Sequence, residues 1–583
     1  MIEFISRVPI EKGWSEDKKY CVTDAAGTRY LLRVSPLARR ENRRALYEIL
    51  RQVVATGIPM NLPVDFWVDD EGVCMLYSWI DGEDLGEDSL PHLPETEQYA
   101  LGLQAGEILR KIHSIPAPVY QEDWETRFNR KINTKIQKYS ECGLRFEGDE
   151  HVLAYIEQNR HLLENRPQCF QHGDYHANNM MITHPSEPAG SPGTPRNGKL
   201  CIIDFDRYDF GDPWEEFNRI VWCAQESPHF ATGMLRGYFD GSPPRGLEPP
   251  MEFFKLLALY IASNTLSSIT WAIPFGQEQI DILVAQSQDV LRWYDDMRNP
   301  VPSWYLKDYH VQWIDGMPVK LRAPFDLSFL GKYGRVFKVF DYQDSGNLCF
   351  GTEKDGQRFF VKFAGAPTVY DNISPEQAIA NLKRSVQIYE NLAHPNLINL
   401  VKAEEIGGGF AMVFDWVDGF CMGKQYPEDR ARFMGLPLKT RMRVFHGLLE
   451  FHAHVAKQNY VAIDFYDGSI LWDIASEKAV ICDIDCYQKA PYVNEMGRMW
   501  GSSRFMSPEE FQLGAVIDEV TNVFAMGAAA FALFAGGSRT PEDWPLDMAL
   551  YDIAQKAVSK DRGERWQSIA LMKEAWNVGL QDI

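Results

Sequence analysis

The sequence predicts an α+β protein with two tandem bilobal domains, each with a small β-rich lobe followed by a large helical lobe. Strand-like patches open the chain, and helical periodicity dominates from about Pro94 onward. After a Pro-rich break at residues 299–303, the same succession of strands and helices begins again. The turn signals Asp81-Gly82 and Asp418-Gly419 occupy the same relative place in the two halves. We therefore expect two related domains whose sequences have diverged.

The bulk composition limits the classes of function. A net charge of −22 would repel a phosphate backbone, so we expect no nucleic-acid partner; it would suit a cationic small substrate, although acidic cytosolic proteins are common. The ten cysteines include no C-x-x-C pair, which fits a reducing cytoplasm. The N-terminus lacks the pattern of a signal peptide, and the longest apolar run, residues 523–537, is too short to cross a bilayer. We expect a cytoplasmic protein without a membrane partner.

The small lobe of the first half can be predicted element by element. Strand-like residues 19–22 and 30–34 flank a turn at Ala26-Gly27 and predict a hairpin. A charged helix is expected from about Arg39 to Ala55, because Gly57-Ile58-Pro59 is a helix stop. A further strand is expected at residues 74–80.

The stretch most indicative of function lies between the helices of the first half. It reads His172-Gly173-Asp174-Tyr175-His176-Ala177-Asn178-Asn179, and Ile202-Ile203-Asp204-Phe205-Asp206 follows. Asp174 and Asn179 stand five residues apart, and Asp204 ends an apolar run about 25 residues further on. Phosphoryl transfer needs one carboxylate to orient the attacking hydroxyl and two oxygen ligands to hold Mg²⁺ against the nucleotide phosphates. The pattern therefore predicts a kinase-type transferase.

Over roughly residues 1–306 these motifs resemble the aminoglycoside phosphotransferase/choline kinase branch of the protein-kinase-like fold. Three further segments share the resemblance: Leu31-Leu32-Arg33-Val34, residues 109–116 and residues 211–217. The resemblance implies ATP and Mg²⁺ as cofactors. It also implies a small-molecule hydroxyl substrate, such as an aminoglycoside, an amino alcohol or a sugar.

The resemblance assigns roles by position in this chain. Asp174 would be the catalytic base, and Asn179 and Asp204 would bind Mg²⁺. Arg33 would meet the nucleotide phosphates where many kinases have lysine. Its expected helix partner is Glu48, with Glu41 as the alternative.

Two further expectations concern loops of the first domain. His172 is expected to brace the catalytic loop through hydrogen bonds. Residues 9–15 are only a weak candidate for a glycine-rich loop.

Residues 325–583 resemble the eukaryotic-like Ser/Thr protein kinases, with residues 307–324 expected to be a linker. The similar segments, in kinase order, are residues 330–336, a strand at 358–363, a helix at 377–392, a strand at 411–416, residues 462–469 and 483–485, residues 504–509 and residues 561–565. Gly331 and Gly334 would belong to a glycine-rich loop, and Lys362 would bind phosphate. Asp464 would be the catalytic residue and Asp483 the metal ligand.

The same resemblance implies that an arginine of residues 561–565 pairs with Glu509 as a buried bridge.

Several positions depart from the protein-kinase pattern. Ala462-Ile463 replaces His-Arg before Asp464, so switching by activation-loop phosphorylation is not expected. Ser469 stands where the metal-binding Asn is usual, and a hydroxyl is a shorter ligand for a second Mg²⁺.

The helix that should carry the glutamate partner of Lys362 has Ser385 at that place, unless Glu390 or Glu376 substitutes. Asp483-Ile484-Asp485 replaces Asp-Phe-Gly. These departures favour a pseudokinase or weak kinase over a competent protein kinase.

Three functions therefore remain open. The first is a small-molecule kinase in the first domain with a regulatory or weakly active second domain, which could have a protein partner or substrate. The second is a protein Ser/Thr kinase acting through the second domain. The third is a non-catalytic nucleotide-binding scaffold. The complete set of Asp174, Asn179 and Asp204 favours the first.

Overall fold

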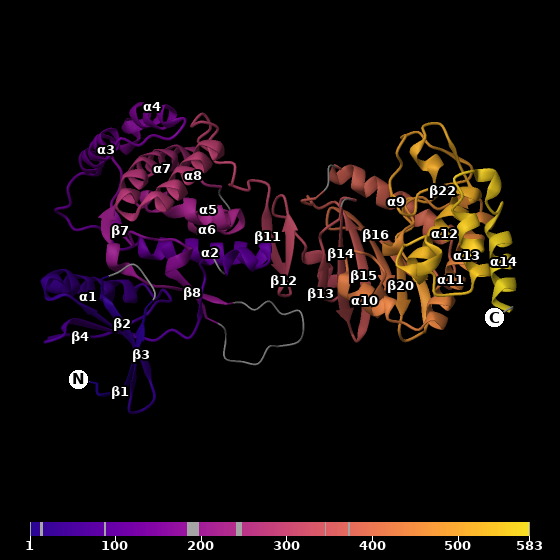
Figure 1. The fold of residues 1–583 in the computed structure, drawn as a ribbon, viewed down its shortest axis with the longest axis horizontal. Coiled ribbons are helices and arrows are strands. Elements are labelled where there is room, and N and C mark those ends of the chain that lie inside the picture. The colour runs from indigo at the N-terminus through magenta and orange to yellow at the C-terminus, as the bar shows by residue number, and fades with distance from the viewer. Residues whose placement is uncertain are drawn as a thin grey trace. The chain divides into compact units, whose positions relative to one another are not determined.

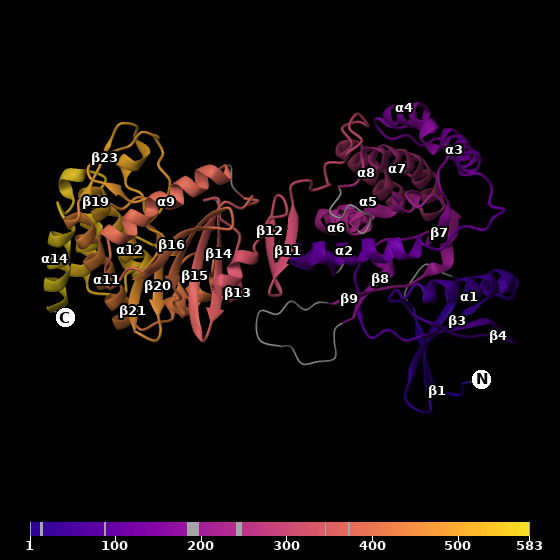
Figure 2. The same ribbon diagram turned by 180° about the vertical axis from the view of Figure 1, so that it is seen from behind.

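The computed structural model describes residues 2–11, 16–86, 89–183, 198–240, 248–343, 345–370 and 373–581. The chain forms two compact units, Met1–Val311 and Gln312–Ile583 (Figures 1 and 2). The expected linker at residues 307–324 contains two neighbouring strands, β11 (His310–Ile314) and β12 (Met317–Leu321). Asp315 and Gly316 join them, both with positive φ, as a two-residue hairpin requires. The residues expected to form a linker thus include a hairpin.

The small lobe of the first unit is a five-stranded sheet of order β1-β2-β3-β5-β4. Its strands are β1 (Phe4–Ile10), β2 (Lys18–Asp24), β3 (Arg29–Ser35), β4 (Pro63–Asp69) and β5 (Gly72–Ser78). Helix α1 (Arg40–Ala55) contacts β4 and β5 through the face that carries Leu46, Leu50 and Val53. The expected hairpin, helix and strand are all confirmed.

The helical lobe of the first unit surrounds the expected catalytic stretch. Its helices are α2 (Glu95–Ile112), α3 (Trp124–Glu141), α4 (Asp149–Asn159), α5 (Ile220–Glu226), α6 (Pro228–Phe239), α7 (Met251–Ala272) and α8 (Gln277–Trp293). Short strands accompany them: β6 (Glu83–Asp84), β7 (Cys169–Gln171), β8 (Met180–Thr183), β9 (Lys199–Ile202) and β10 (Asp209–Gly211).

Helices α2 and α6 approach each other through glycines. A Cβ atom on Gly106 would lie 2.1 Å from the carbonyl oxygen of Met234, and one on Gly237 would lie 2.1 Å from that of Leu103. Only residues without a side chain fit this contact. It matters for the site, because the hydroxyl of Tyr175, in the catalytic loop, donates a hydrogen bond of 2.7 Å to the carbonyl oxygen of Ala105 on α2.

The sheet of the second unit has the order β13-β14-β15-β17-β16, the same order of first, second, third, fifth and fourth strand as in the first unit. Its strands are β13 (Arg335–Phe340), β14 (Asn347–Lys354), β15 (Gln357–Ala364), β16 (Leu400–Ile406) and β17 (Gly409–Asp415), and α9 (Pro375–Asn391) packs on β17. The strands expected at 358–363 and 411–416 and the helix expected at 377–392 are confirmed. Both units thus repeat one plan of sheet and helix.

Helices also dominate the rest of the second unit. They are α10 (Pro427–Met434), α11 (Leu438–Lys457), α12 (Glu519–Ala535), α13 (Met548–Ala557) and α14 (Ile569–Gln581). Small strands complete it: β18 (Gly419–Cys421), β19 (Tyr460–Val461), β20 (Ile470–Asp473), β21 (Lys478–Ile481), β22 (Gln488–Lys489), β23 (Tyr492–Val493) and β24 (Val516–Ile517).

Two general expectations can be compared with the structure. All ten cysteines are free thiols. The apolar run at residues 523–537 lies largely in α12, which is buried. Among the described residues one helical segment, Met251–Phe275, is long and apolar enough to cross a bilayer, yet 67% of its most apolar window is buried within the protein. Buried core helices commonly have this composition.

Candidate active site

His172 braces the loop that carries Asp174. Its fully buried ring lies with Nε2 3.0 Å from the carbonyl oxygen of Ile203, while Nδ1 accepts the backbone N–H of Asp174 at 3.3 Å. Burial lowers the pKa of His172, so the neutral ring donates at one nitrogen and accepts at the other. This confirms the bracing role expected from the sequence and links the Asp174 loop to the residue before Asp204.

Gly173 is required by the backbone path next to the site. It has φ of +83°, and a Cβ atom there would lie 1.9 Å from the carbonyl oxygen of Arg207. Its backbone N–H donates to the buried carboxylate of Glu216 at 2.9 Å. Glu216 therefore fixes the position from which Asp174 projects, a role that no sequence pattern indicates.

Hydrogen bonds bring the loop of Asp174 and Asn179 next to the residue before Asp204. The side-chain amide of Asn179 donates to the carbonyl oxygen of Asp174 at 2.9 Å. The carbonyl oxygen of Asn179 accepts the N–H of Ile203 at 3.1 Å, which places Asp204 beside it. Asp204 itself has φ of +65°, an uncommon conformation for a residue with a side chain.

The charge on Asp174 is stabilised by neighbouring side chains. Burial raises its pKa, but His176, Arg219 and Arg207 lower it more strongly, and the net pKa lies below the usual value. One carboxylate oxygen lies 3.6 Å from Nε2 of His176 and 3.4 Å from Nε of Arg219, and the other lies 3.7 Å from Nε of Arg207. Asp174 is therefore ionised at neutral pH, as a hydroxyl-orienting base must be. Neither arginine was predicted from the sequence.

Arg33 on β3 meets the expected metal-binding residue. Its guanidinium lies 3.2 Å from Asp204, 3.1 Å from Asp17 and in a closer ion pair with Asp206. Burial raises the pKa of Asp204, but Arg33 lowers it below the usual value. Arg33 is thus buried among three carboxylates, one of which is the expected metal-binding residue Asp204.

The helix partner expected for Arg33 requires correction. Glu48 has a side chain 60% exposed and lies 3.9 Å from Arg51, and Glu41 is exposed as well. Helix α1 instead turns Arg43 inward, where it contacts Asp17 at 2.5 Å and Asp206 at 2.8 Å. The counter-charge for Arg33 comes from Asp17 and Asp206 rather than from the helix. The pattern of charges along α1 could not reveal which face packs inward.

The oxygen atoms of the first site suit a hard cation. The amide nitrogen of Asn179 is engaged by Asp174, which leaves its amide oxygen as the atom that could bind a metal. Asp204 adds a partly exposed carboxylate. Amide and carboxylate oxygens are the ligands that Mg²⁺ prefers. The set therefore fits the metal expected from the sequence.

A second constellation lies in the second unit. Lys362 on β15 contacts Asp483 at 2.8 Å and Asp485 at 2.7 Å. Burial lowers the pKa of Lys362, but the two carboxylates raise it well above its usual value. Lys362 lowers the pKa of Asp483 in turn. The third residue of Asp483-Ile484-Asp485 thus neutralises the basic residue, as Asp206 does for Arg33 in the first unit.

Two expectations for the second unit concern the partner of Lys362. Ser385 is buried, and its hydroxyl donates to the carbonyl oxygen of Leu382 at 2.8 Å. Glu376 and Glu390 are exposed and do not substitute for a clamp. Tyr389 of the same helix reaches the site instead, with its hydroxyl 3.0 Å from Asp485. The clamp is therefore Asp485, supported by Tyr389.

Gly331 and Gly334 do not lie beside Lys362, which corrects their predicted role. They precede β13 at the end where Arg335 pairs with Glu353, whereas Lys362 pairs with Cys349 near the other end of β14. Four residues of strand separate the two ends by roughly 13 Å. Gly334 instead has φ of +112°, and a Cβ atom there would lie 2.1 Å from the carbonyl oxygen of Glu353. In the first unit, residues 9–15 do join β1 to β2, but residues 12–15 lie outside the described residues.

Asp464 and Ser469 lie in the loop before β20. Asp464 has φ of +63°, and Gly501 of the later loop packs so closely that a Cβ atom on it would lie 3.4 Å from Asp464 Oδ1. The hydroxyl of Ser469 is buried without a hydrogen-bond partner in the part of the chain that the structure describes. Asp464 thus lies beside the loop that contains Gly501, and the side chain of Ser469 is buried within the unit.

An ion pair that the sequence did not predict ties this loop to residues 495–507. Fully buried Asp467 accepts two hydrogen bonds from Arg504, at 2.9 and 3.0 Å, and a third from Arg430 at 3.0 Å. The pair is bidentate and, unlike a contact to a phosphorylated residue, needs no modification of the chain.

The buried bridge expected at Glu509 is confirmed. Arg565 contacts both its carboxylate oxygens, at 2.7 and 3.0 Å, and Arg562 contacts it at 2.8 Å.

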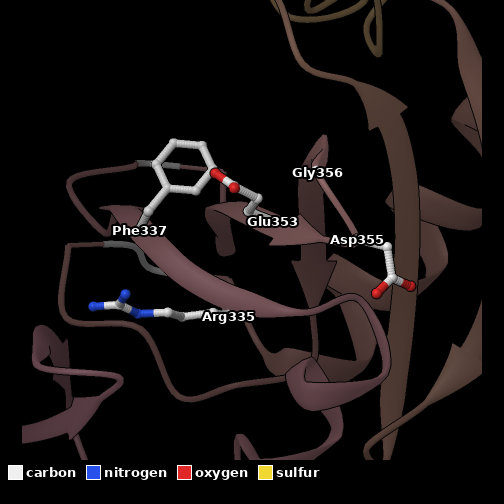
Figure 3. Close-up of a pocket in the computed structure, with 5 residues that line it drawn as sticks. All are labelled: Arg335, Phe337, Glu353, Asp355 and Gly356. Atoms are coloured by element: carbon white, nitrogen blue, oxygen red, sulfur yellow. The ribbon is translucent and has the colours of Figure 1, made fainter.

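A separate cavity of about 230 Å³ lies in the second unit. Figure 3 shows its lining: Arg335 and Phe337 on β13, Glu353 on β14, and Asp355 and Gly356 in the following turn. Its lining includes none of the predicted catalytic or metal-binding residues. The cavity lies at the start of β13, away from Lys362, which pairs near the other end of β14.

Comparison with known proteins agrees with the chemistry of the first site. The model of a phosphotransferase enzyme family matches residues 6–253, a range that includes Arg33, Asp174, Asn179 and Asp204. The chain is also 21% identical over 194 residues to the serine/threonine-protein kinase PrkC of Bacillus subtilis. That match covers 33% of this chain and 29% of PrkC, so the chain spans less than a third of that relative. The first unit has the features of a phosphotransferase, and both similarities support an enzyme of the kinase type.

Proposed function

We propose that the protein is an ATP- and Mg²⁺-dependent phosphotransferase whose first unit transfers the γ-phosphoryl group to the hydroxyl of a small molecule. The convergence of Asp174, Asn179 and Asp204, within the part of the chain that matches a phosphotransferase family, carries the proposal. Phosphoryl transfer depends chiefly on positioning and charge stabilisation, and these residues provide both.

Each residue of the first unit has a defined task in this proposal. Ionised Asp174 accepts the hydrogen bond of the acceptor hydroxyl, orients its oxygen toward the γ-phosphorus and takes up the proton late. Arg33 exchanges part of its contact with Asp204 and Asp206 for phosphate oxygens. Asn179 and Asp204 would hold Mg²⁺, which neutralises charge on the phosphate oxygens when bound.

For the second unit we propose a regulatory or weakly active role. Lys362, Asp464 and Asp483 support nucleotide binding, and enclosed Ser469 is a poor replacement for the usual metal-binding amide. A rival is a protein kinase acting through this unit on a protein substrate; the similarity of the chain to PrkC supports the protein-kinase activity, and the placement of Lys362 beside Asp483 supports this unit as its site. A regulatory role would instead require a protein partner or coupling to the first unit.

Two separate substitutions in the full-length chain distinguish these possibilities. Asp174→Asn and Asp464→Asn should be assayed with radiolabelled ATP, against small hydroxyl compounds and against a casein-type protein. We expect Asp174→Asn to reduce small-molecule phosphorylation by about 10³-fold or more, while Asp464→Asn leaves it within about twofold of wild type. Asp174→Asn is close in size to the native residue, so thermal melting should be nearly unchanged.

Other outcomes would reassign the function. Protein phosphorylation lost in Asp464→Asn would assign the activity to the second unit. Absence of transfer from the wild-type chain to any acceptor, with nucleotide binding intact, would favour the scaffold. Full small-molecule turnover by Asp174→Asn would end the main proposal.

A further inference from the structure

The side chains that surround Asp174 are mainly cationic. Arg219, from the 3-10 helix at Glu215–Arg219, lies 3.4 Å from one carboxylate oxygen, and Arg207 lies 3.7 Å from the other. Both distances exceed those of a good charge-assisted hydrogen bond, which are about 2.7–2.9 Å. The two guanidinium groups are therefore near the base without being tightly bound by it.

Arg219 has hydrogen-bonding capacity that the protein leaves unused. Its Nε atom is buried and has no hydrogen-bond partner among the residues that the structure describes. Within the same residues, the contact with Asp174 is its one ion pair. Burying an unpaired donor costs free energy, and a ligand that accepts from it removes that cost. The side chain of Arg207 is 58% exposed, so it is accessible to the same ligand from solvent.

The phosphate-binding cation of the first unit is in a different situation. Arg33 contacts Asp17, Asp204 and Asp206, so it is saturated with carboxylates and adjoins the expected metal-binding residue. Arg207 and Arg219 adjoin Asp174 instead. Because Asp174 would hydrogen-bond the acceptor hydroxyl, these cations lie next to the place where that hydroxyl would bind.

A lysine extends the positive region along α3. Burial chiefly lowers the pKa of half-buried Lys135, to about 8; Glu215 opposes this shift, and nearby Lys131 and Arg219 add to it. Burial also raises the pKa of Glu215, which weakens it as a counter-charge. A cationic amine placed here would meet like charges, whereas an anion would be stabilised by them.

We infer that the acceptor of the first unit is an anionic hydroxyl compound, whose carboxylate or phosphate group binds Arg219 and Arg207 while its hydroxyl meets Asp174. The inference rests on the proposed function and narrows its acceptor. It disfavours aminoglycosides and cationic amino alcohols, even though the net charge of the whole chain, −22, would attract them.

The first experiment compares acceptor classes with the full-length protein. Transfer from radiolabelled ATP should be measured to glycerate as a hydroxy acid, glycerol 3-phosphate as a phosphate monoester, choline and kanamycin as cations, and glucose as a neutral control. We expect transfer to an anionic compound to exceed transfer to the cations by at least about tenfold. Efficient Asp174-dependent transfer to choline or kanamycin would overturn the inference while leaving the proposed function intact.

The second experiment tests the arginines. Arg219→Gln should raise KM for the anionic acceptor about tenfold or more, with KM for ATP within about twofold of wild type, and Arg219→Lys should recover part of the loss. Arg298→Gln removes an exposed arginine paired with Asp295 and serves as the matched control. A fall in kcat with an unchanged KM for the acceptor would instead assign Arg219 to the transferred phosphoryl group and overturn the inference.

Direct binding separates failure of the inference from failure of the proposed function. Glycerate and glycerol 3-phosphate should be titrated calorimetrically into wild type, Arg219→Gln and Arg298→Gln in the presence of the non-hydrolysable nucleotide AMP-PNP. We expect binding that Arg219→Gln weakens and Arg298→Gln preserves. Equal binding by all three proteins, or no binding at millimolar concentration, overturns the inference whether or not transfer occurs.

Discussion

The carboxylate of Asp17 lies 2.5 Å from Arg43 and 3.1 Å from Arg33, and all three side chains are buried. Asp17 therefore takes the place that a helix glutamate was expected to take. We expect Asp17→Asn to lower the free energy of unfolding of the first unit by about 3–5 kcal/mol, because it leaves two buried guanidinium groups short of counter-charge. Denaturant titration measures this loss. Glu48→Gln, on the exposed face of α1, should change the free energy of unfolding by less than about 0.5 kcal/mol. A larger effect of Glu48→Gln would instead support Glu48 as the partner of Arg33.

Arg504 and Asp467 should hold residues 495–507 in order without phosphorylation. Arg504→Lys keeps the charge but cannot make two parallel hydrogen bonds, so we expect faster amide exchange in this segment, by at least about fivefold. Hydrogen exchange followed by mass spectrometry measures it. Exposed Arg498 lies in the same segment and donates only to backbone carbonyl groups at 3.3 Å, so Arg498→Lys is the control. Equal protection in the two variants would contradict the role given to the ion pair.

Ser469 offers a test of metal binding in the second unit. Its buried hydroxyl has no hydrogen-bond partner among the described residues, so Ser469→Ala should leave the unit equally stable or stabilise it by up to about 1 kcal/mol. If Ser469 is not a metal ligand, the thermal shift produced by Mg²⁺-ATP through the second unit should also be unchanged. The measurement is best made in an Asp204→Asn background, which disables the first site. Loss of that shift in Ser469→Ala would make the hydroxyl a ligand.

Glu510 should make the stability of the second unit depend on pH. Burial raises its pKa to about 7, against the opposing effect of its hydrogen bonds from Ser507. The folded state therefore holds a proton that the unfolded state releases, and stability should fall as the pH rises from about 4.5 to about 7. Glu510→Gln keeps an oxygen that accepts from Ser507 and removes the ionisation. Relative to wild type, the variant should therefore gain about 1–3 kcal/mol of stability between pH 4.5 and a pH above 7. Thermal melting of both proteins across this range measures the difference. An identical pH profile for variant and wild type would refute the assignment.

Local patterns predicted much of the fold. The hairpin of β2 and β3, the helix α1 with its stop at Gly57, and the strands around Lys362 follow from periodicity and turn residues, and the structure has them at the expected places. The hairpin at Asp315-Gly316 also carries a turn signal, although residues 307–324 are expected from the sequence only to form a linker.

The sequence by itself determined the loop that joins Asp174 to Asn179 and the place of Asp204 after a buried strand. Asp174 and Asn179 are close along the chain, and Asp204 directly follows a strand. Their positions in the sequence therefore restrict their positions in the fold. Only the tertiary structure decided that Asp17, Arg43 and Asp206 surround Arg33, that Asp485 serves Lys362, that Gly331 and Gly334 lie away from the second site, and that Arg207 and Arg219 face Asp174. Such contacts depend on which helix face turns inward and which strand end meets which loop. These contacts are determined by the packing of the whole unit, so they cannot be predicted from the spacing of residues along the chain.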